Sequence, residues 1–85
     1  METKEGKLVG KISHYFSNIG VAVIDLSDKL EAGDEIRIIG GEIDFNQTVG
    51  SMEADHKKVE KAKKGDSIGI KVDQKVREGY RVYKP

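Results

Sequence analysis

The sequence predicts an all-β domain, built as a small closed antiparallel β-barrel of six or seven strands. Apolar and polar residues alternate with a period of two along much of the 85-residue chain, and ten glycines with a single proline suit short strands joined by tight turns. Because so many short strands would leave free edges in an open sheet, closure into a barrel is favoured. We expect one domain over residues 1–85, with 1–5 as a disordered tail.

The expected strands can be followed in chain order. In KLVGKIS, Leu8, Gly10 and Ile12 should share one face. The run IGVAVIDL, residues 19–26, is apolar and rich in β-branched residues, which is typical of a strand covered on both sides. Further strands are expected at 35–39, 42–45, 48–53 and 80–84. A single helical candidate, 55–64, is long enough for one or two turns.

The segment SIGIKV gives the clearest alternation. Its core-facing residues should be Ile68, Ile70 and Val72, and its outward residues Ser67, Gly69 and Lys71.

One turn pattern occurs three times, as LEAGDEI, AKKGDSI and VREGYRV. Each central glycine, Gly33, Gly65 or Gly79, is expected at a positive φ, a conformation that a Cβ disfavours. The flanking apolar pairs, Leu30 with Ile36, Ala62 with Ile68 and Val76 with Val82, should hold each turn to the core. Gly40 and Gly41 are expected to form a two-residue hairpin loop. None of these glycines lies in a GxxxxGK[ST] phosphate loop.

Composition excludes several classes of protein. A chain this short buries a small core and leaves no room for a large internal active site. Without cysteine it has neither a disulfide nor a thiolate metal site. With no apolar run long enough for a signal peptide or a membrane span, we expect a soluble, cytoplasmic protein.

Charge is balanced overall but not along the chain. Residues 1–42 carry 5 basic and 8 acidic residues, whereas residues 43–85 carry 10 and 7. Much of the basic excess lies in HKKVEKAKK, residues 56–64. Such a run can attract phosphate, but a solvated surface turn is the favoured interpretation of the run alone.

The cluster His14-Tyr15-Phe16 is unusual for a strand-connecting loop. An exposed ring there could stack on an unpaired base. We expect Phe16 to cap the open end of the barrel, and leave both interpretations open for His14 and Tyr15. Met52, Tyr80 and Tyr83 are expected in the core or at the barrel rim.

The sequence contains no recognised motif for catalysis or metal binding. His14 and His56 lack further ligands at a recognised spacing, and no serine has an evident base. We expect no enzyme activity, no cofactor and no bound nucleotide.

Several motifs resemble two known families. The segment VGSMEADHKKVEKAKKGDSIGIKV is similar to V-x-S-M and A-x-x-G-D-x-x-G-I in domain II of the translational GTPases related to elongation factor Tu. Matching residues are Val49, Ser51, Met52, Ala62, Gly65, Asp66, Gly69 and Ile70. HYF-x-x-I-G-V-A-V at 14–23 and D-F-x-Q-x-V-x-S-M at 44–52 resemble the C-terminal barrel of the collagenase-like peptidase family, several members of which act in RNA hydroxylation. The similarity covers residues 6–84, and a free chain of this length resembles small translation elongation factor-like proteins.

The resemblance implies binding without either parent activity, since these 85 residues match neither the GTPase domain nor the peptidase-like catalytic domain. In elongation factor Tu the barrel holds the aminoacylated 3′ end of tRNA near the S-M segment, which implicates Ser51, Met52 and the loop after them. The factor's acidic residue beside this Met is Ser51 here, and its pocket Arg falls near Ala54 or Asp55. The resemblance therefore does not imply the same recognition of an aminoacyl ester.

The sequence thus predicts a non-catalytic module that contacts RNA, tRNA or a ribonucleoprotein. The alternative is a module that docks onto a separately encoded peptidase-like or RNA-modifying enzyme. The predicted contact residues are His14, Tyr15, Ser51, Met52, His56, Lys57, Lys58, Lys61 and Lys64.

Overall fold

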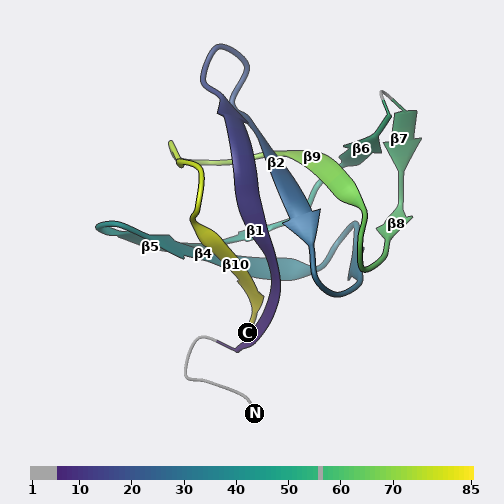
Figure 1. Cartoon of the computed structure of the whole chain (residues 1–85), viewed down its shortest axis with the longest axis horizontal. Helices are drawn as coiled ribbons and strands as arrows, with labels where there is room; N and C mark the ends of the chain where they lie inside the picture. Colours follow the sequence, from purple (N-terminus) through teal and green to yellow (C-terminus); the bar gives the residue numbers. More distant parts are fainter. Residues whose placement is uncertain (1–5, 56) are drawn as a thin grey trace.

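The computed structural model describes residues 6–55 and 57–85, so the tail predicted at 1–5 and the candidate His56 lie outside the described residues. The described residues contain ten strands (Figure 1): β1 Lys7–Phe16, β2 Val21–Leu26, β3 Leu30–Glu31, β4 Glu35–Gly40, β5 Ile43–Thr48, β6 Met52–Ala54, β7 Lys57–Val59, β8 Lys61–Ala62, β9 Ser67–Lys71 and β10 Arg81–Lys84. All pairings are antiparallel. The all-β class is confirmed, with more and shorter strands than predicted.

Two segments differ from their predicted structure. The helical candidate 55–64 is wrong, because this stretch holds β7, paired with β6, and β8, paired with β3. The strand predicted at 48–53 is broken, since β5 ends at Thr48 and β6 begins at Met52.

Eight strands form one sheet in the order β5-β4-β10-β1-β2-β9-β6-β7, and β3 with β8 forms a second. In Figure 1 the large sheet folds over on itself, so that β4 and β5 cross behind β1 and β10. Among the described residues no pairing joins the edge strands β5 and β7. The predicted closure into a barrel is therefore not shown.

The buried side-chain amide of Gln47 connects the edge strand β5 to the end of β9. Gln47 on β5 is 7% exposed. Its Nε2 donates to the Lys71 carbonyl oxygen at 2.8 Å, and its Oε1 accepts from the Asp73 N–H at 2.9 Å. Since both ends of the amide are satisfied, Gln47 fixes β5 to the end of β9 without a strand ladder.

The core lies inside the curled sheet and is formed by one apolar cluster. Its buried members are Val9, Ile12, Ala22, Ile24, Leu26, Leu30, Ile36, Ile38, Phe45, Val49, Met52, Ala62, Ile68, Ile70, Val72, Val76 and Val82. The predicted inward set Ile68, Ile70 and Val72 is confirmed, as are the three apolar pairs around the turns.

Two predictions about β1 and β2 need correction. Leu8 is 45% exposed, because the β1–β10 register shifts between Leu8 and Gly10 and puts Val9 in the core instead. β2 is not covered on both sides, since Ala22 and Ile24 are buried whereas Val21 and Val23 are half-buried on the opposite face.

The three repeated turns share one backbone geometry. Gly33, Gly65 and Gly79 have φ of +95°, +93° and +93°, as predicted. In each turn the residue after the glycine donates its N–H to the carbonyl oxygen three positions earlier, at 3.1, 3.0 and 3.3 Å. This bond with a positive φ at the third position is the pattern of a type II turn. The repeat is therefore a structural device for entering the next strand.

Replacing Gly33 by Val should lower the free energy of unfolding by more than about 1 kcal/mol, because Val is strained at this φ. No atom lies within 4 Å of a Cβ built at Gly33, so the effect would come from the backbone alone. Gly50→Val is a matched control, since Gly50 also has open space and is not among the positive-φ residues. Urea unfolding of both variants tests the assignment, and equal midpoints would contradict it.

Acidic side chains reinforce the first two turns. Asp34 Oδ2 accepts from the Glu31 N–H at 2.9 Å, and Asp66 Oδ2 accepts from the Lys63 N–H at 3.0 Å. Asp34 also lies 3.0 Å from the Lys84 ammonium. Partial burial raises the pKa of Asp34, but the Glu31 hydrogen bond and Lys84 lower it more, so the net shift is downward. The first turn is thereby tied to the last strand.

This lowered pKa predicts acid sensitivity. A carboxyl whose pKa is lower in the folded state stabilises the fold above its unfolded pKa, and that contribution is lost as the pH falls through the folded pKa. Asp34→Asn should therefore cost up to about 1 kcal/mol at pH 7, and the difference from the wild type should shrink below about pH 4. Urea midpoints at several pH values measure it. Lys84→Gln should lower the free energy of unfolding less in the Asp34→Asn variant than in the wild type, because its ion-pair partner is already gone. An equal loss in both would contradict the coupling.

The β4–β5 hairpin uses its two glycines differently from each other. Gly40 pairs with Ile43, so the loop is Gly41-Glu42 and not Gly40-Gly41. Gly41 supplies the positive φ, at +54°. Gly40 is needed for packing, because a Cβ there would overlap Cδ1 and Cγ of the Tyr80 ring.

Candidate binding groove between two hairpins

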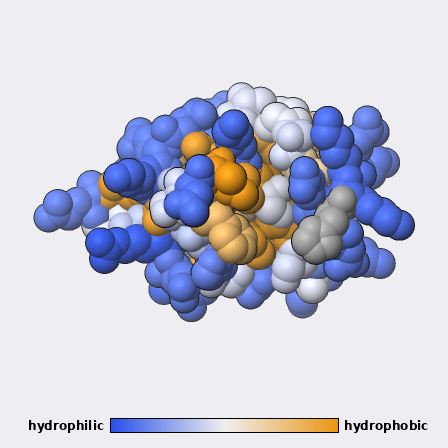
Figure 2. Space-filling model, turned by 90° about the horizontal axis from the view of Figure 1, so that it is seen from above, coloured by the Kyte–Doolittle hydropathy of each residue, from blue (hydrophilic) through white to orange (hydrophobic). Residues whose placement is uncertain are grey.

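A groove crosses the outer face of the sheet over β9, between the β1–β2 hairpin and the β6–β7 hairpin. Its volume is about 640 Å³, and it is lined by Phe16, Ile19, Val21, Val23, Ser51, Glu53, Asp55, Ser67, Ile68, Gly69, Ile70 and Lys71. Figure 2 shows an apolar patch in the middle of the upper face, with hydrophilic side chains around it.

Strand register builds the floor of the groove. His14 pairs with Val23, Val23 with Gly69, and Gly69 with Glu53, so these four positions form one row across the outer face. Gly69 contributes no side chain to this row. The floor is therefore lowest over Gly69, with the half-buried Val21 and Val23 beside it.

The first wall is apolar. Phe16 at the end of β1 is 46% exposed, and Ile19 in the following turn is 61% exposed. The N–H groups of Ile19 and Gly20 both donate to the Phe16 carbonyl oxygen, at 3.2 and 2.9 Å, which holds this turn in place. The rings of His14 and Phe16 meet edge to face, with centroids 4.4 Å apart. Because exposed apolar side chains of this size are costly in water, this wall is the candidate contact surface of the groove.

The second wall is acidic. Ser51, Glu53 and Asp55 are exposed and line the side formed by β6. Asp55 has φ +52°, which Asp tolerates better than most residues, and it follows β6 into the turn toward β7. Neither Glu53 nor Asp55 is within 4 Å of a basic group in the part of the chain that the structure describes. Lys71 is the basic residue among those lining the groove.

The predicted site residues from the first strand do not share one face. Tyr15 pairs with Ala22 on the inner face and packs against the core cluster, whereas His14 is exposed on the outer face. Phe16 was expected to cap the open end of the barrel, but its side chain is 46% exposed and lines the groove. All three lie in β1 and not in a connecting loop.

The S-M segment is also divided. Ser51 lies at the groove, but Met52 has 0% exposure and belongs to the core. The prediction that Met52 belongs to the core is confirmed. Its predicted contact with a partner is wrong, because the buried side chain is not accessible.

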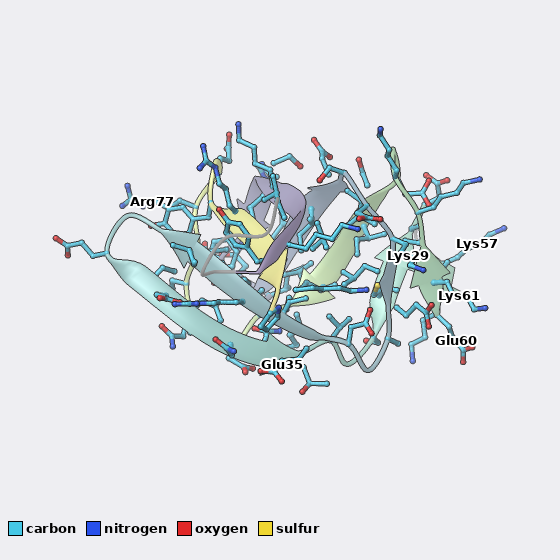
Figure 3. The ribbon with its side chains drawn as sticks, turned by 90° about the horizontal axis from the view of Figure 1, so that it is seen from below. Lys29, Glu35, Lys57, Glu60, Lys61 and Arg77 are labelled. Carbon is cyan, nitrogen blue, oxygen red and sulfur yellow. The ribbon has the colours of Figure 1, made fainter. Side chains whose placement is uncertain are left out.

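The predicted lysines are exposed and come from β7, β8 and the second repeated turn, which together are called the lysine end. Lys57 and Lys58 lie on the edge strand β7, opposite Ala54 and Glu53, while Lys61 on β8 is opposite Glu31, and Lys64 lies in the second turn. Figure 3 shows Lys57 and Lys61 at one end of the molecule with Lys29 and the acidic Glu60. Charged side chains on an edge strand discourage pairing with other chains, which gives Lys57 and Lys58 a structural role.

The groove residues Ile19, Val21, Val23, Gly69, Glu53 and Asp55 were not predicted as site residues. A signal for two of them was present, because Val21 and Val23 alternate with Ala22 and Ile24 and therefore belong to the opposite face. Nothing local in the sequence indicates that Glu53 faces Gly69, since that proximity depends on the β6–β9 register.

The described residues offer little for catalysis. His14 Nδ1 is 3.8 Å from the Glu78 carboxylate, with both side chains well exposed. Ser13 and Ser67 donate to the Val23 carbonyl oxygen and to the Asp25 carboxylate, and neither bonds a histidine. No group of three or more His, Asp or Glu residues that could hold a metal ion occurs over 6–55 and 57–85. The described part of the chain also has no helix able to cross a membrane.

Comparisons with known proteins give relatives in sequence and in structure, although no family model matches the chain. The chain is 42% identical over 76 residues to an uncharacterized protease of Methanocaldococcus jannaschii, covering 88% of this chain and 19% of that protein. It is 39% identical over 84 residues to a collagenase of Porphyromonas gingivalis, covering 96% and 23%. The chain thus spans about a fifth of the length of these relatives.

Two solved structures share the fold. The C-terminal domain of a putative U32 peptidase of Geobacillus thermoleovorans superposes with a TM-score of 0.88 at 20% identity, covering 92% of this chain and 99% of that one. A bacterial selenocysteine-specific elongation factor matches with a TM-score of 0.73 at 20% identity, covering 96% and 15%. Both predicted resemblances are therefore confirmed: the chain is similar in sequence to part of a protease and of a collagenase, and in fold to a U32 peptidase C-terminal domain and to a domain of an elongation factor.

Proposed function

We propose that this chain is a non-catalytic docking module, which holds a protein partner in the groove between its two hairpins. The observation that carries the proposal is the groove itself, with Phe16 and Ile19 exposed on one wall. The other wall carries two carboxylates that have no ion pair within residues 6–55 and 57–85. A half-exposed apolar strip with a polar rim is the usual composition of a protein interface.

The relatives favour a particular kind of partner. In the protease and the collagenase, a segment similar to this chain is one part of a much longer protein. The proposed partner is a peptidase-like or RNA-modifying enzyme.

Affinity capture at two salt concentrations tests docking against RNA binding. Docking should retain the same protein after nuclease treatment at both about 50 and 300 mM salt, because screening weakens contacts to the carboxylates but not apolar burial. Material that is lost with salt and removed by nuclease would refute the docking proposal.

Contact with RNA is the second candidate function, supported by the lysines at the β7 and β8 end. The groove itself favours RNA less, since Glu53 and Asp55 would repel phosphates. An RNA contact would therefore use the lysine end, with affinity that is weak and strongly dependent on salt.

Replacing Lys57, Lys58, Lys61 and Lys64 together by Gln should flatten this salt dependence, which is about −0.7 in log–log slope for each phosphate neutralised on a single strand. Thermal stability should change by less than about 0.5 kcal/mol, as all four residues are exposed. A control with the same loss of charge replaces the exposed Lys11, Lys75, Arg77 and Arg81. Titration of a labelled single-stranded RNA measures the slopes, and equal slopes for the two variants would exclude the lysine end as an RNA site.

A further inference from the structure

We infer that the groove selects a partner segment with a Lys or Arg side chain next to an apolar residue, and that the basic side chain lies over Gly69. This inference rests on the proposed docking function and adds the chemistry of the partner. Its basis is the arrangement of one apolar floor, one apolar wall and one acidic wall around a position without a side chain.

The floor suits the aliphatic part of a long basic side chain. Val23 and Gly69 are cross-strand neighbours, and Val21 is close enough that a Cβ added to Gly69 would lie 3.3 Å from its Cγ1. The space above Gly69 is thus bounded by valine methyl groups and open to solvent. Lys and Arg side chains cover such apolar surface with their methylene stems while the charge remains near water.

The acidic wall suits the charged end. Glu53 is the next residue across the sheet from Gly69, and Asp55 lines the same side of the groove. Lys58 lies beyond Glu53 on β7, opposite it in the ladder, but no ion pair joins the two. Among the residues that the structure describes, neither Glu53 nor Asp55 has a basic partner, so both carboxylates can bind a cation from outside.

The apolar wall suits the neighbouring residue of the partner. Phe16 and Val21 are cross-strand neighbours in the next row, with Lys71 after them, so apolar surface lies beside the Gly69 position. An apolar side chain adjacent to the basic one would cover the exposed ring of Phe16. Lys71, in the same row as Phe16, would repel a positive charge. The partner's basic side chain should therefore lie over Gly69, and its apolar side chain should lie beside Phe16.

Three short peptides and one RNA serve as probes: acetyl-Leu-Arg-Leu-amide, the matched peptides with Glu or Gln in place of Arg, and a uridine tetranucleotide. Titration into the ¹⁵N-labelled full chain follows backbone amide shifts. We expect the Arg peptide to shift the amides of Val23, Gly69 and Glu53, with weaker binding of the Gln peptide and the weakest binding of the Glu peptide.

Neutralising variants test the charges. Glu53→Gln with Asp55→Asn should weaken the Arg peptide by about tenfold, since each partly exposed charge contact supplies up to about fivefold. Asn is compatible with the positive φ of Asp55, so the fold should be retained. Lys71→Gln, a change of opposite sign in the same groove, should tighten binding of the Arg peptide.

The outcomes separate this inference from the docking function. Equal shifts of the groove amides by all three peptides would overturn the selection of a basic side chain and leave groove docking in place. Shifts caused by the RNA and by none of the peptides would overturn docking itself. If no probe moves these amides, both are wrong.

Discussion

Replacing Gly40 by Val is expected to lower the free energy of unfolding by about 3 kcal/mol, at the upper end of the usual cost of overpacking. A Cβ at Gly40 would overlap ring atoms close to the root of the Tyr80 side chain, so a small movement of the ring end cannot relieve the contact. The Tyr80 backbone is also held in place. Its N–H donates to the Arg77 carbonyl oxygen at 3.3 Å, and its own carbonyl oxygen accepts from the Ile12 N–H at 2.8 Å.

A double-mutant cycle separates this overlap from any general intolerance of β4. In a Tyr80→Ala background the same Gly40→Val change should cost under about 1 kcal/mol, because the overlapping ring is gone. Urea unfolding at neutral pH gives the four free energies. An equal cost in both backgrounds would show that Tyr80 is not the cause. For a domain of this length, with about 4 to 13 kcal/mol of total stability, the single variant should be visibly destabilised.

The three type II turns were predictable from the sequence because their requirement is local. A positive φ selects glycine whatever surrounds it, and Gly33, Gly65 and Gly79 all meet that requirement. The double glycine was predictable as a hairpin for the same reason. The role of Gly40 was not, because its neighbour Tyr80 is 40 positions away in the chain.

The faces of β1 could not be predicted because two irregularities interrupt its alternation. The β1–β2 register shifts between Ile12 and His14, which leaves Ser13 as an extra residue. Strict alternation from the buried Ile12 would put His14 and Phe16 inward and Tyr15 outward. The shift reverses this, so Tyr15 packs on the core and Phe16 reaches the groove.

The candidate site was only partly predictable for a related reason. Ser51 was predicted as a contact residue through a family resemblance; it is exposed and lines the groove, and its contact role stays a prediction. Gly69 was assigned to the outward face of its strand, which is confirmed, but an outward glycine has no visible purpose until its neighbours are known. Those neighbours, Val23 and Glu53, come from distant strands, and only the register brings them together.

Gly69→Val is expected to abolish partner binding while leaving stability unchanged or slightly increased. Stability should be maintained because glycine is unfavourable inside a strand, whereas a β-branched side chain fits an outward strand position. Gly69 is not among the positive-φ residues. Its built Cβ would lie 3.3 Å from Val21 Cγ1, a tight contact that the Val21 side chain, half-buried at the groove, must relieve by shifting a few tenths of an ångström. The added methyl groups would occupy the space proposed for the partner.

Affinity capture with wild-type chain and with Gly69→Val, alongside thermal melts of both, checks this prediction. Partner recovery should fall at least about tenfold, since a filled pocket excludes a side chain that would otherwise contribute on the order of 1.5 kcal/mol or more. Gly50→Val is the control, because Gly50 is exposed, has open space for a Cβ and is not one of the residues lining the groove. If Gly69→Val melts at or above the wild-type temperature and still captures the same protein, the partner binds elsewhere. The groove would then be a consequence of strand register alone, and the exposed Phe16 and Ile19 would remain without a function.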